Sequence, residues 1–290
     1  MVKSRPPKRH ATASARATGP AAANVAAGDN AAPLAGSPGL DDGQALSQTD
    51  AALDLIRSKI VDMTLEPGSR IDERLLVDQF RLGRTPAREA IHRLVAEGFV
   101  RIMRQRGGTF VRKLDLDEMG EVVVAHQLAE SVLGQMCHLD DPTLLADLMA
   151  IQRRYAGCVS RREFLTITQL NQEFHLRLHR TVGNALFYDF AESTHRHVRR
   201  LNVYIYQREQ ADPEFQSAQF VANLDQHNKI IEAVADRDRG VLNRLLPDHA
   251  KYTQHRLLRL LERASLGALE ADLSGLAHPL TLGRVPSVPA

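Results

Sequence analysis

The segment from Gly83 to Leu94 restricts the fold of this chain more than any other stretch. It reads Gly-Arg-Thr-Pro-Ala-Arg-Glu-Ala-Ile-His-Arg-Leu, with the proline where the first turn of a helix tolerates it. In an α-helix its apolar residues fall on one stripe that can dock on a core: Ala87, Ala90, Ile91 and Leu94. Another face carries cations every four residues: Arg84, Arg88 and His92. The segment therefore predicts a helix with one packed face and one cationic face.

A helix that packs by small apolar residues and presents arginines from its first turns suits the major groove of DNA. Bidentate arginine to guanine is the commonest specific base contact, and recognition helices read bases with their amino-terminal residues. For this helix alone, the alternative is a solvated charged face on an ordinary surface helix. The neighbouring segments decide between the two interpretations.

The flanking segments supply the rest of a DNA-binding module. A helical stripe starts near Thr49 and ends at the Pro67-Gly68 turn, and a second short helix is predicted over residues 72–80. Two short strands, 99–103 and 108–113, flank a Gly-Gly turn. Three helices and a hairpin predict a winged helix-turn-helix. Its basic wing residues are expected to lie over phosphates and to add salt-dependent affinity: Arg101, Arg104, Arg106, Arg112 and Lys113.

Residues 51–113 carry a motif set that spans the whole predicted module. In chain order it is Leu65-x-Pro67-Gly68-x-x-Ile71, Glu73-Arg74, Leu76, Phe80, Arg84-Thr85-Pro86-x-Arg88-Glu89-Ala90, Arg93-Leu94, Glu97-Gly98 and Gly107-Gly108-x-x-Val111. This set resembles the DNA-binding domain of GntR-type bacterial transcription regulators. The resemblance implies contacts with operator bases or adjacent phosphates, and a glycine at the wing tip: Arg74, Arg84, Thr85, Arg88 and Gly107. Gly83 replaces the usual Ser or Thr N-cap, which removes only a side-chain phosphate contact.

The rest of the chain is predicted to be mainly α-helical. Six helical segments follow one another, at about 117–138, 142–158, 161–182, 185–207, 214–236 and 238–266. The domain prediction is a disordered basic arm over 1–46, a winged helix-turn-helix over 47–113, an all-helical bundle over 114–268, and a tail over 269–290 with no assigned function. The bundle is the predicted effector-binding and dimerisation domain.

Three histidines are predicted to face the interior of the bundle. Asn171 and His175 lie one turn apart, His227 lies between Leu224 and Ile231, and His249 follows an apolar residue by one turn. Imidazoles from three helices and a nearby amide oxygen suit one divalent ion. The alternative is that each is an ordinary core histidine, since the chain has 12 histidines and chance pairs are expected. Three others are left outside the predicted site: His179, His195 and His197.

A second motif set crosses the helical region. It consists of Glu130, Asn171-x-x-Phe174-His175, Gly183-Asn184, Gln226-His227-x-x-Ile230-x-x-Ala233 and His249. Residues 117–256 resemble the FCD-type effector domain of the FadR subfamily of GntR regulators. The resemblance implies a divalent, zinc-like metal that helps to hold a small carboxylate effector, with these ligands: Asn171, His175, His227 and His249.

Several residues depart from the pattern of that family. Asn171 stands where many members have Asp, which should weaken metal affinity, and His126 stands where Arg is common. Pro247 is expected to disturb the last helix near His249. Arg200 and its neighbour Arg199 are expected on an exposed basic patch. The residues that bind the effector are not assigned.

The composition excludes several function classes. No apolar run approaches the ~20 residues of a membrane span. The two cysteines form no disulfide framework, so a cytoplasmic protein is predicted. The prediction is a homodimeric DNA-binding repressor that binds an inverted repeat and responds to a small organic acid. A regulator that responds to metal alone stays open as an alternative. A metal-dependent enzyme with Glu130 as its base is disfavoured, because no segment carries a hydrolytic motif.

Overall fold

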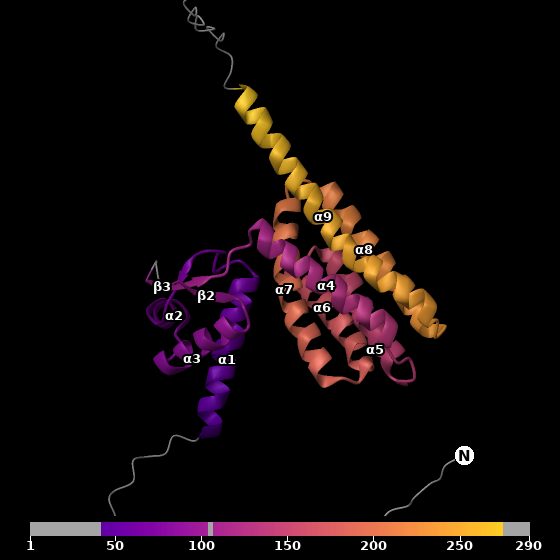
Figure 1. Ribbon diagram of the computed structural model, residues 1–290, viewed down its shortest axis with the longest axis horizontal. Coiled ribbons are helices and arrows are strands. Elements are labelled where there is room, and N and C mark those ends of the chain that lie inside the picture. The colour runs from indigo at the N-terminus through magenta and orange to yellow at the C-terminus, as the bar shows by residue number, and fades with distance from the viewer. Residues whose placement is uncertain (1–41, 104–106, 275–290) are drawn as a thin grey trace, which may run out of the picture. The chain divides into compact units, whose positions relative to one another are not determined.

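The computed structural model describes residues 42–103 and 107–274, which include a small domain with a three-stranded sheet and a helical bundle (Figure 1). The first domain contains α1 (Asp42–Val61), β1 (Arg70–Ile71), α2 (Glu73–Phe80), α3 (Arg84–Ala96), β2 (Val100–Met103) and β3 (Gly108–Val111). The strands are antiparallel in the order β1-β3-β2. The predicted winged helix-turn-helix is confirmed, with β1 as an additional short edge strand.

Local sequence signals fix the ends of α2 and α3. The Asp72 carboxylate accepts a hydrogen bond from the Leu75 backbone N–H at 3.0 Å and caps α2. Arg81 closes the same helix in the left-handed conformation, with φ of 57°. Gly83 begins α3 without a side-chain cap, as expected from its lack of a hydroxyl. The predicted apolar stripe of α3 is buried against α1, which holds the cationic face of α3 outward.

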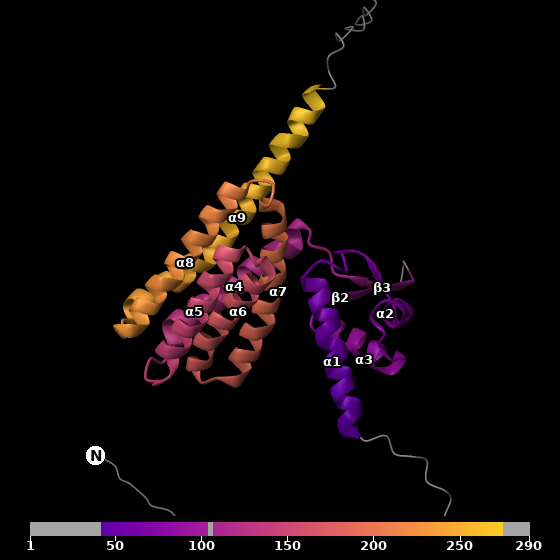
Figure 2. The same ribbon diagram turned by 180° about the vertical axis from the view of Figure 1, so that it is seen from behind.

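The second domain is the predicted all-helical bundle, and α4 to α9 run side by side in Figures 1 and 2. Its helices are α4 (Leu116–Met136), α5 (Leu144–Arg161), α6 (Phe164–His179), α7 (Ala185–Glu209), α8 (Pro213–Ala235) and α9 (Arg239–Ser274), with a short 3₁₀ turn over Arg180–Val182. Each predicted helical segment corresponds to one of these helices. In the described part of the chain, no helix is long and apolar enough for a membrane crossing.

Three expectations about helix ends and interiors are corrected. The first helix begins at Asp42, ahead of the predicted start near Thr49, and the last continues to Ser274, past the predicted end of the domain. Helix α9 continues through Pro247 because it packs against α4 and α8, although proline removes one backbone hydrogen bond. Residues 1–41 of the predicted arm, residues 275–290 of the predicted tail, and Arg104 and Arg106 of the wing lie outside the described residues.

Helix α7 belongs to the bundle and also contacts the DNA-binding domain. Val203 joins the apolar core of that domain. His197 donates through Nε2–H to the Glu97 carbonyl oxygen at 2.9 Å, and its ring stacks on Phe99 with centroids 4.3 Å apart. Arg200 is therefore not on an exposed patch: it is 1% exposed and donates to the Arg112 carbonyl oxygen at 2.5 Å. The prediction of an exposed basic patch is therefore wrong for Arg200. Its partner at Arg112 lies far away in the sequence, so the local pattern gives no sign of the contact.

Candidate DNA-binding face and buried histidine site

The cationic face of α3 is open to solvent. Arg84, Thr85 and Arg88 are exposed, opposite the buried alanines of the same helix. Arg74 on α2 is also exposed and lines a groove with Arg84 between the two helices. The ion pairs here are long and exposed: Arg88 to Glu73 at 3.9 Å and Arg74 to Asp78 at 3.6 Å. Such pairs contribute little stability, so the guanidinium groups can exchange them for DNA.

The wing has an exposed glycine at its turn, but one of its arginines is held internally. Gly107 is exposed in the left-handed region, with φ of +61° and open space where a Cβ would stand. Arg112, predicted to lie over phosphates, instead pairs with Glu118 and Glu121, at 2.5 Å in both cases. Its side chain is only 18% exposed, because the start of α4 covers it. The predicted phosphate role of Arg112 is therefore wrong.

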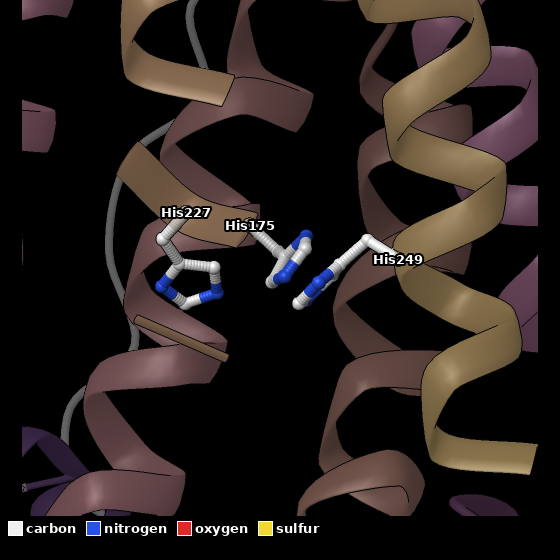
Figure 3. Close-up of side chains that lie close together, drawn as sticks. All are labelled: His175, His227 and His249. Atoms are coloured by element: carbon white, nitrogen blue, oxygen red, sulfur yellow. The ribbon is translucent and has the colours of Figure 1, made fainter. Parts of the chain in front are cut away.

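The structure brings three predicted histidines together from three helices (Figure 3). His175 on α6, His227 on α8 and His249 on α9 each offer a ligand atom, and these atoms lie within 4.8 Å of one another. We call this group the trihistidine site. All three side chains are buried. Asn171, the fourth predicted ligand, is also buried, one turn before His175 on the same helix.

Hydrogen bonds fix which nitrogen each of these imidazoles presents. Every Nδ1 meets a side-chain oxygen: Glu130 Oε2 for His175 at 3.1 Å, Gln152 Oε1 for His227 at 3.2 Å, and Gln226 Oε1 for His249 at 2.7 Å. The Gln152 amide nitrogen donates to Leu224 O and Asn228 Oδ1, which turns its oxygen toward His227. Because each oxygen accepts an Nδ1–H, each ring in its neutral form keeps a lone pair on Nε2. Metal-binding histidines have this arrangement of outer hydrogen bonds.

The trihistidine site fits a divalent cation. Nε2 of His175 and of His227 are buried and have no hydrogen-bond partner within the described residues. Burial lowers the pKa of His227 well below its ordinary value and that of His249 to about 3, and the neighbouring histidines lower both further. These two rings are therefore neutral near pH 7, which is the form that binds metal ions.

A second cluster of buried polar groups adjoins the trihistidine site. Glu130 on α4 is fully buried, and its Oε1 lies 3.1 Å from His179 Nε2 and 3.0 Å from His195 Nε2. His126, one turn before Glu130, is also buried. The rings of His175 and His195 are stacked with centroids 5.2 Å apart, so the two groups share one compartment. We call His126, Glu130, His179 and His195 the glutamate cluster.

Electrostatics in the glutamate cluster favour a charged carboxylate and, for His126 and His195, neutral rings. Burial alone would raise the pKa of Glu130, but the charge and hydrogen bond of His175, with the hydrogen bonds of His179 and His195, hold it well below its ordinary value. Burial lowers the pKa of His195 to about 4 and that of His126 well below its usual range. The sequence prediction left out His179 and His195. A signal existed, since His179 follows His175 by one turn and Glu130 follows His126 by one turn.

Comparison with known proteins matches both domains. Residues 48–111 match the model of the gntR family of bacterial regulatory proteins, and residues 122–251 match that of the FCD domain. The HTH-type transcriptional repressor RspR of Escherichia coli K12 is 25% identical over 204 residues, covering 67% of this chain and 82% of the relative. The gluconate operon transcriptional repressor of Bacillus subtilis is 22% identical over 188 residues, covering 64% and 75%.

Solved structures share the fold. Escherichia coli McbR/YncC superposes with a TM-score of 0.59 at 17% identity, covering 75% of this chain and 98% of that one. The two family models together span both described domains, and the curated relatives are transcription regulators rather than enzymes. This chain therefore belongs to the GntR family and is a DNA-binding transcription regulator with an FCD domain.

Proposed function

We propose that the protein is a homodimeric repressor whose affinity for an inverted-repeat operator responds to a small carboxylate effector. In this proposal the helical domain holds the effector together with a divalent, zinc-like metal ion. The observation that carries it is the trihistidine site, in which outer hydrogen bonds occupy the Nδ1 atoms of three buried histidines whose ligand atoms lie within 4.8 Å of one another. Repression is supported by the names of the two relatives, both of which are repressors.

The DNA-binding half of the proposal rests on the exposed cations of α2 and α3. Arg84, Thr85 and Arg88 would contact base edges, and Arg74 would contact bases or adjacent phosphates. Gly107 would let the wing turn approach the backbone without a side chain in the way. A two-fold dimer presents two recognition helices to successive major grooves, so the operator should be an inverted repeat.

The effector half rests on His175, His227 and His249, with Asn171 as the fourth ligand. A divalent ion bound there would supply open positions for a carboxylate oxygen of the effector. Asn171 brings no charge. The ionised Glu130 lies behind His175, bonded to its Nδ1–H, and places a negative charge next to the site. The Glu130 carboxylate would thus supply part of the negative charge that an aspartate at position 171 would bring.

Helix α7 offers the path from the ligand to the DNA-binding domain. His195 lies in the glutamate cluster, whereas His197, two residues further on, bonds to Glu97 at the end of α3. A ligand that shifts His175 or Glu130 would move α7 and thereby the helix that reads DNA. Couplings of this kind are typically worth ~1–3 kcal/mol, or about 5- to 150-fold in affinity.

The proposed function can be tested by selecting an operator and then titrating the protein–operator complex with small organic acids. Duplexes bound by zinc-loaded protein are enriched from a random pool. The affinity of the protein for the most enriched duplex is then measured by fluorescence anisotropy at one fixed salt concentration. We expect an inverted repeat, and a change of about 5-fold or more with at least one member of a panel of mono-, di- and hydroxycarboxylic acids. A selected site without two-fold symmetry would contradict the dimer model. A response to zinc but to no acid would favour the metal-responsive alternative.

A further inference from the structure

We propose that the glutamate cluster is a second divalent-metal site, formed by His126, Glu130, His179 and His195 beside the trihistidine site. The ion would be of the class that imidazole and a single carboxylate bind together, such as zinc, iron(II) or nickel. None of these four residues is a ligand of the first site. The inference goes beyond the proposed function, because neither acid sensing nor DNA binding requires a second ion.

The spacing of the donor atoms suits one ion. His179 Nε2, His195 Nε2 and Glu130 Oε1 form a triangle with edges of 3.1, 3.0 and 3.2 Å. Zinc binds imidazole nitrogen and carboxylate oxygen at about 2.0–2.2 Å, so tetrahedral ligands stand roughly 3.3–3.5 Å apart. The ligand atoms of His126, Glu130 and His195 also lie within 4.8 Å of one another. The two sets share Glu130 and His195, so the four side chains gather around one pair of donors.

Hydrogen bonds alone satisfy this cluster poorly. Each imidazole Nε2 carries at most one hydrogen and an ionised carboxylate carries none, so the triangle holds at most two hydrogens for its three contacts. Whichever tautomers the two rings adopt, at least one of the three contacts is then left with two hydrogens or two lone pairs facing each other. An ion above the triangle would replace all three contacts at once.

His126 provides an independent indication. Its Nε2 is buried and, within the described residues, has no hydrogen-bond partner. A buried polar atom left without a partner destabilises the fold. The ring of His126 meets that of His195 edge-on, with centroids 5.3 Å apart, so this nitrogen belongs to the same compartment. As a ligand it would complete three nitrogens and one oxygen around the ion.

Charge favours a cation at this position. The buried Glu130 divides its two oxygens between the sites: Oε2 accepts from His175 Nδ1–H, and Oε1 faces His179 and His195. No arginine or lysine side chain in the described residues forms an ion pair with it. A second dication would neutralise this carboxylate and would join the two sites through one side chain.

The test counts metal ions bound by the full-length protein. Chelator-treated protein is loaded with zinc, freed of excess ion by gel filtration, and examined by native mass spectrometry and elemental analysis. The variants are His126→Gln/His195→Gln for the second site and His227→Gln/His249→Gln for the first. The exposed His255→Gln on α9 is the matched control. Circular dichroism melts check folding, and the single variants His126→Gln and His195→Gln replace the double variant if it unfolds.

We expect two zinc ions per chain in the wild type and in His255→Gln, and one in each double variant. If the wild type holds one ion that only His227→Gln/His249→Gln removes, the second site is wrong while the first stands. If the remaining ion is lost only in His126→Gln/His195→Gln, the trihistidine part of the proposed function is wrong and the second site stands. A wild type that binds no zinc contradicts both sites.

Discussion

The guanidinium groups of α3 are available to DNA because nothing in the described fold holds them firmly. Arg84 and Arg88 are exposed, and the ion pair between Arg88 and Glu73 is 3.9 Å long. Arg112, by contrast, is held by two glutamates at 2.5 Å. Arginines of one domain thus differ in their surroundings: those of α3 are exposed with weak partners, whereas Arg112 is paired inside the fold.

Replacing Arg84 or Arg88 by Ala should weaken binding to the selected operator by about 1–3 kcal/mol each, because each change removes a base or phosphate contact. Anisotropy titration at fixed salt measures the loss. Arg153→Ala, which removes the same charge from an exposed position on α5, is the control and should have little effect. Unchanged operator affinity in both α3 variants would show that another surface binds DNA.

A buried ion pair joins α7 to α9. Glu209 and Arg256 are almost fully buried, with Arg256 Nε donating to Glu209 Oε1 at 3.0 Å. Glu209→Gln leaves the arginine charge buried without its counter-ion, so the free energy of unfolding should fall by about 3–5 kcal/mol. Urea denaturation measures this change. The exposed Glu232→Gln on α8 should stay within about 0.5 kcal/mol of wild type, and equal effects of the two variants would rule out the pair as a stabilising contact.

Among the helices, α4 and α9 carry side chains of the two histidine groups and pack closely against each other. Helix α4 carries Glu130, and α9 carries His249. The helices pass so closely that a Cβ added at Gly134 would stand 2.9 Å from the Asn243 Cα. The absence of a side chain at this position therefore permits the observed helix separation.

Gly134→Ala should destabilise the protein by about 1–3 kcal/mol, because the backbone of α9 must move away. Gly120 lies on the same helix with open space around its added Cβ, so Gly120→Ala should instead stabilise by roughly 0.5–1 kcal/mol through helix propensity. Chemical denaturation of the two variants gives the comparison. If both glycines respond alike, close packing at position 134 is not what requires glycine there.

The sequence predicts the helices well because apolar residues recur at helical spacing through the bundle segments and strand signals are scarce there. Strand β1 was missed, since two residues carry no periodic signal and its pairing with β3 is long-range. The early start of α1 was missed because residues near Asp42 lack an apolar stripe. Burial of Arg200 was missed for a similar reason: its backbone partner at Arg112 lies far away in the chain.

The histidine sites were partly predictable. His227 was predicted to face inward because Leu224 and Ile231 flank it at helical spacing, and it is buried. His195 lies between Ala191 and Val198 at the same spacing, so the sequence contained a signal for its burial as well. What spacing does not give is convergence, since the sharing of Glu130 depends on how α4, α6 and α7 pack.

For the molecule as a whole, the buried histidines make the metal-free protein sensitive to acid. The pKa of His195 is lowered to about 4 and that of His249 to about 3, below the ordinary value of 6.5. Below pH 6.5 these histidines are protonated in the unfolded chain. In the folded chain they stay neutral until the pH reaches their lowered pKa values. The contribution of these rings to stability is therefore fully present at neutral pH and is lost as the pH falls from about 6.5 toward 3–4.

Chelator-treated protein should lose up to ~1.4 kcal/mol of stability per pH unit for each such imidazole between about pH 6.5 and 5. Urea unfolding at several pH values measures this slope. His195→Gln/His249→Gln should show a shallower slope, because two of the rings that resist protonation are gone. A variant with the slope of the wild type would mean that other groups cause the acid sensitivity.

We propose that the state of the buried trihistidine site sets DNA affinity through α7. The most direct measurement compares operator affinity of zinc-loaded and chelator-treated protein, in the wild type and in His227→Gln/His249→Gln, at one salt concentration. We predict a difference of about 5- to 150-fold in the wild type, and a variant that still binds DNA but no longer responds to zinc. Equal affinities of the loaded and stripped wild-type protein would contradict the claim.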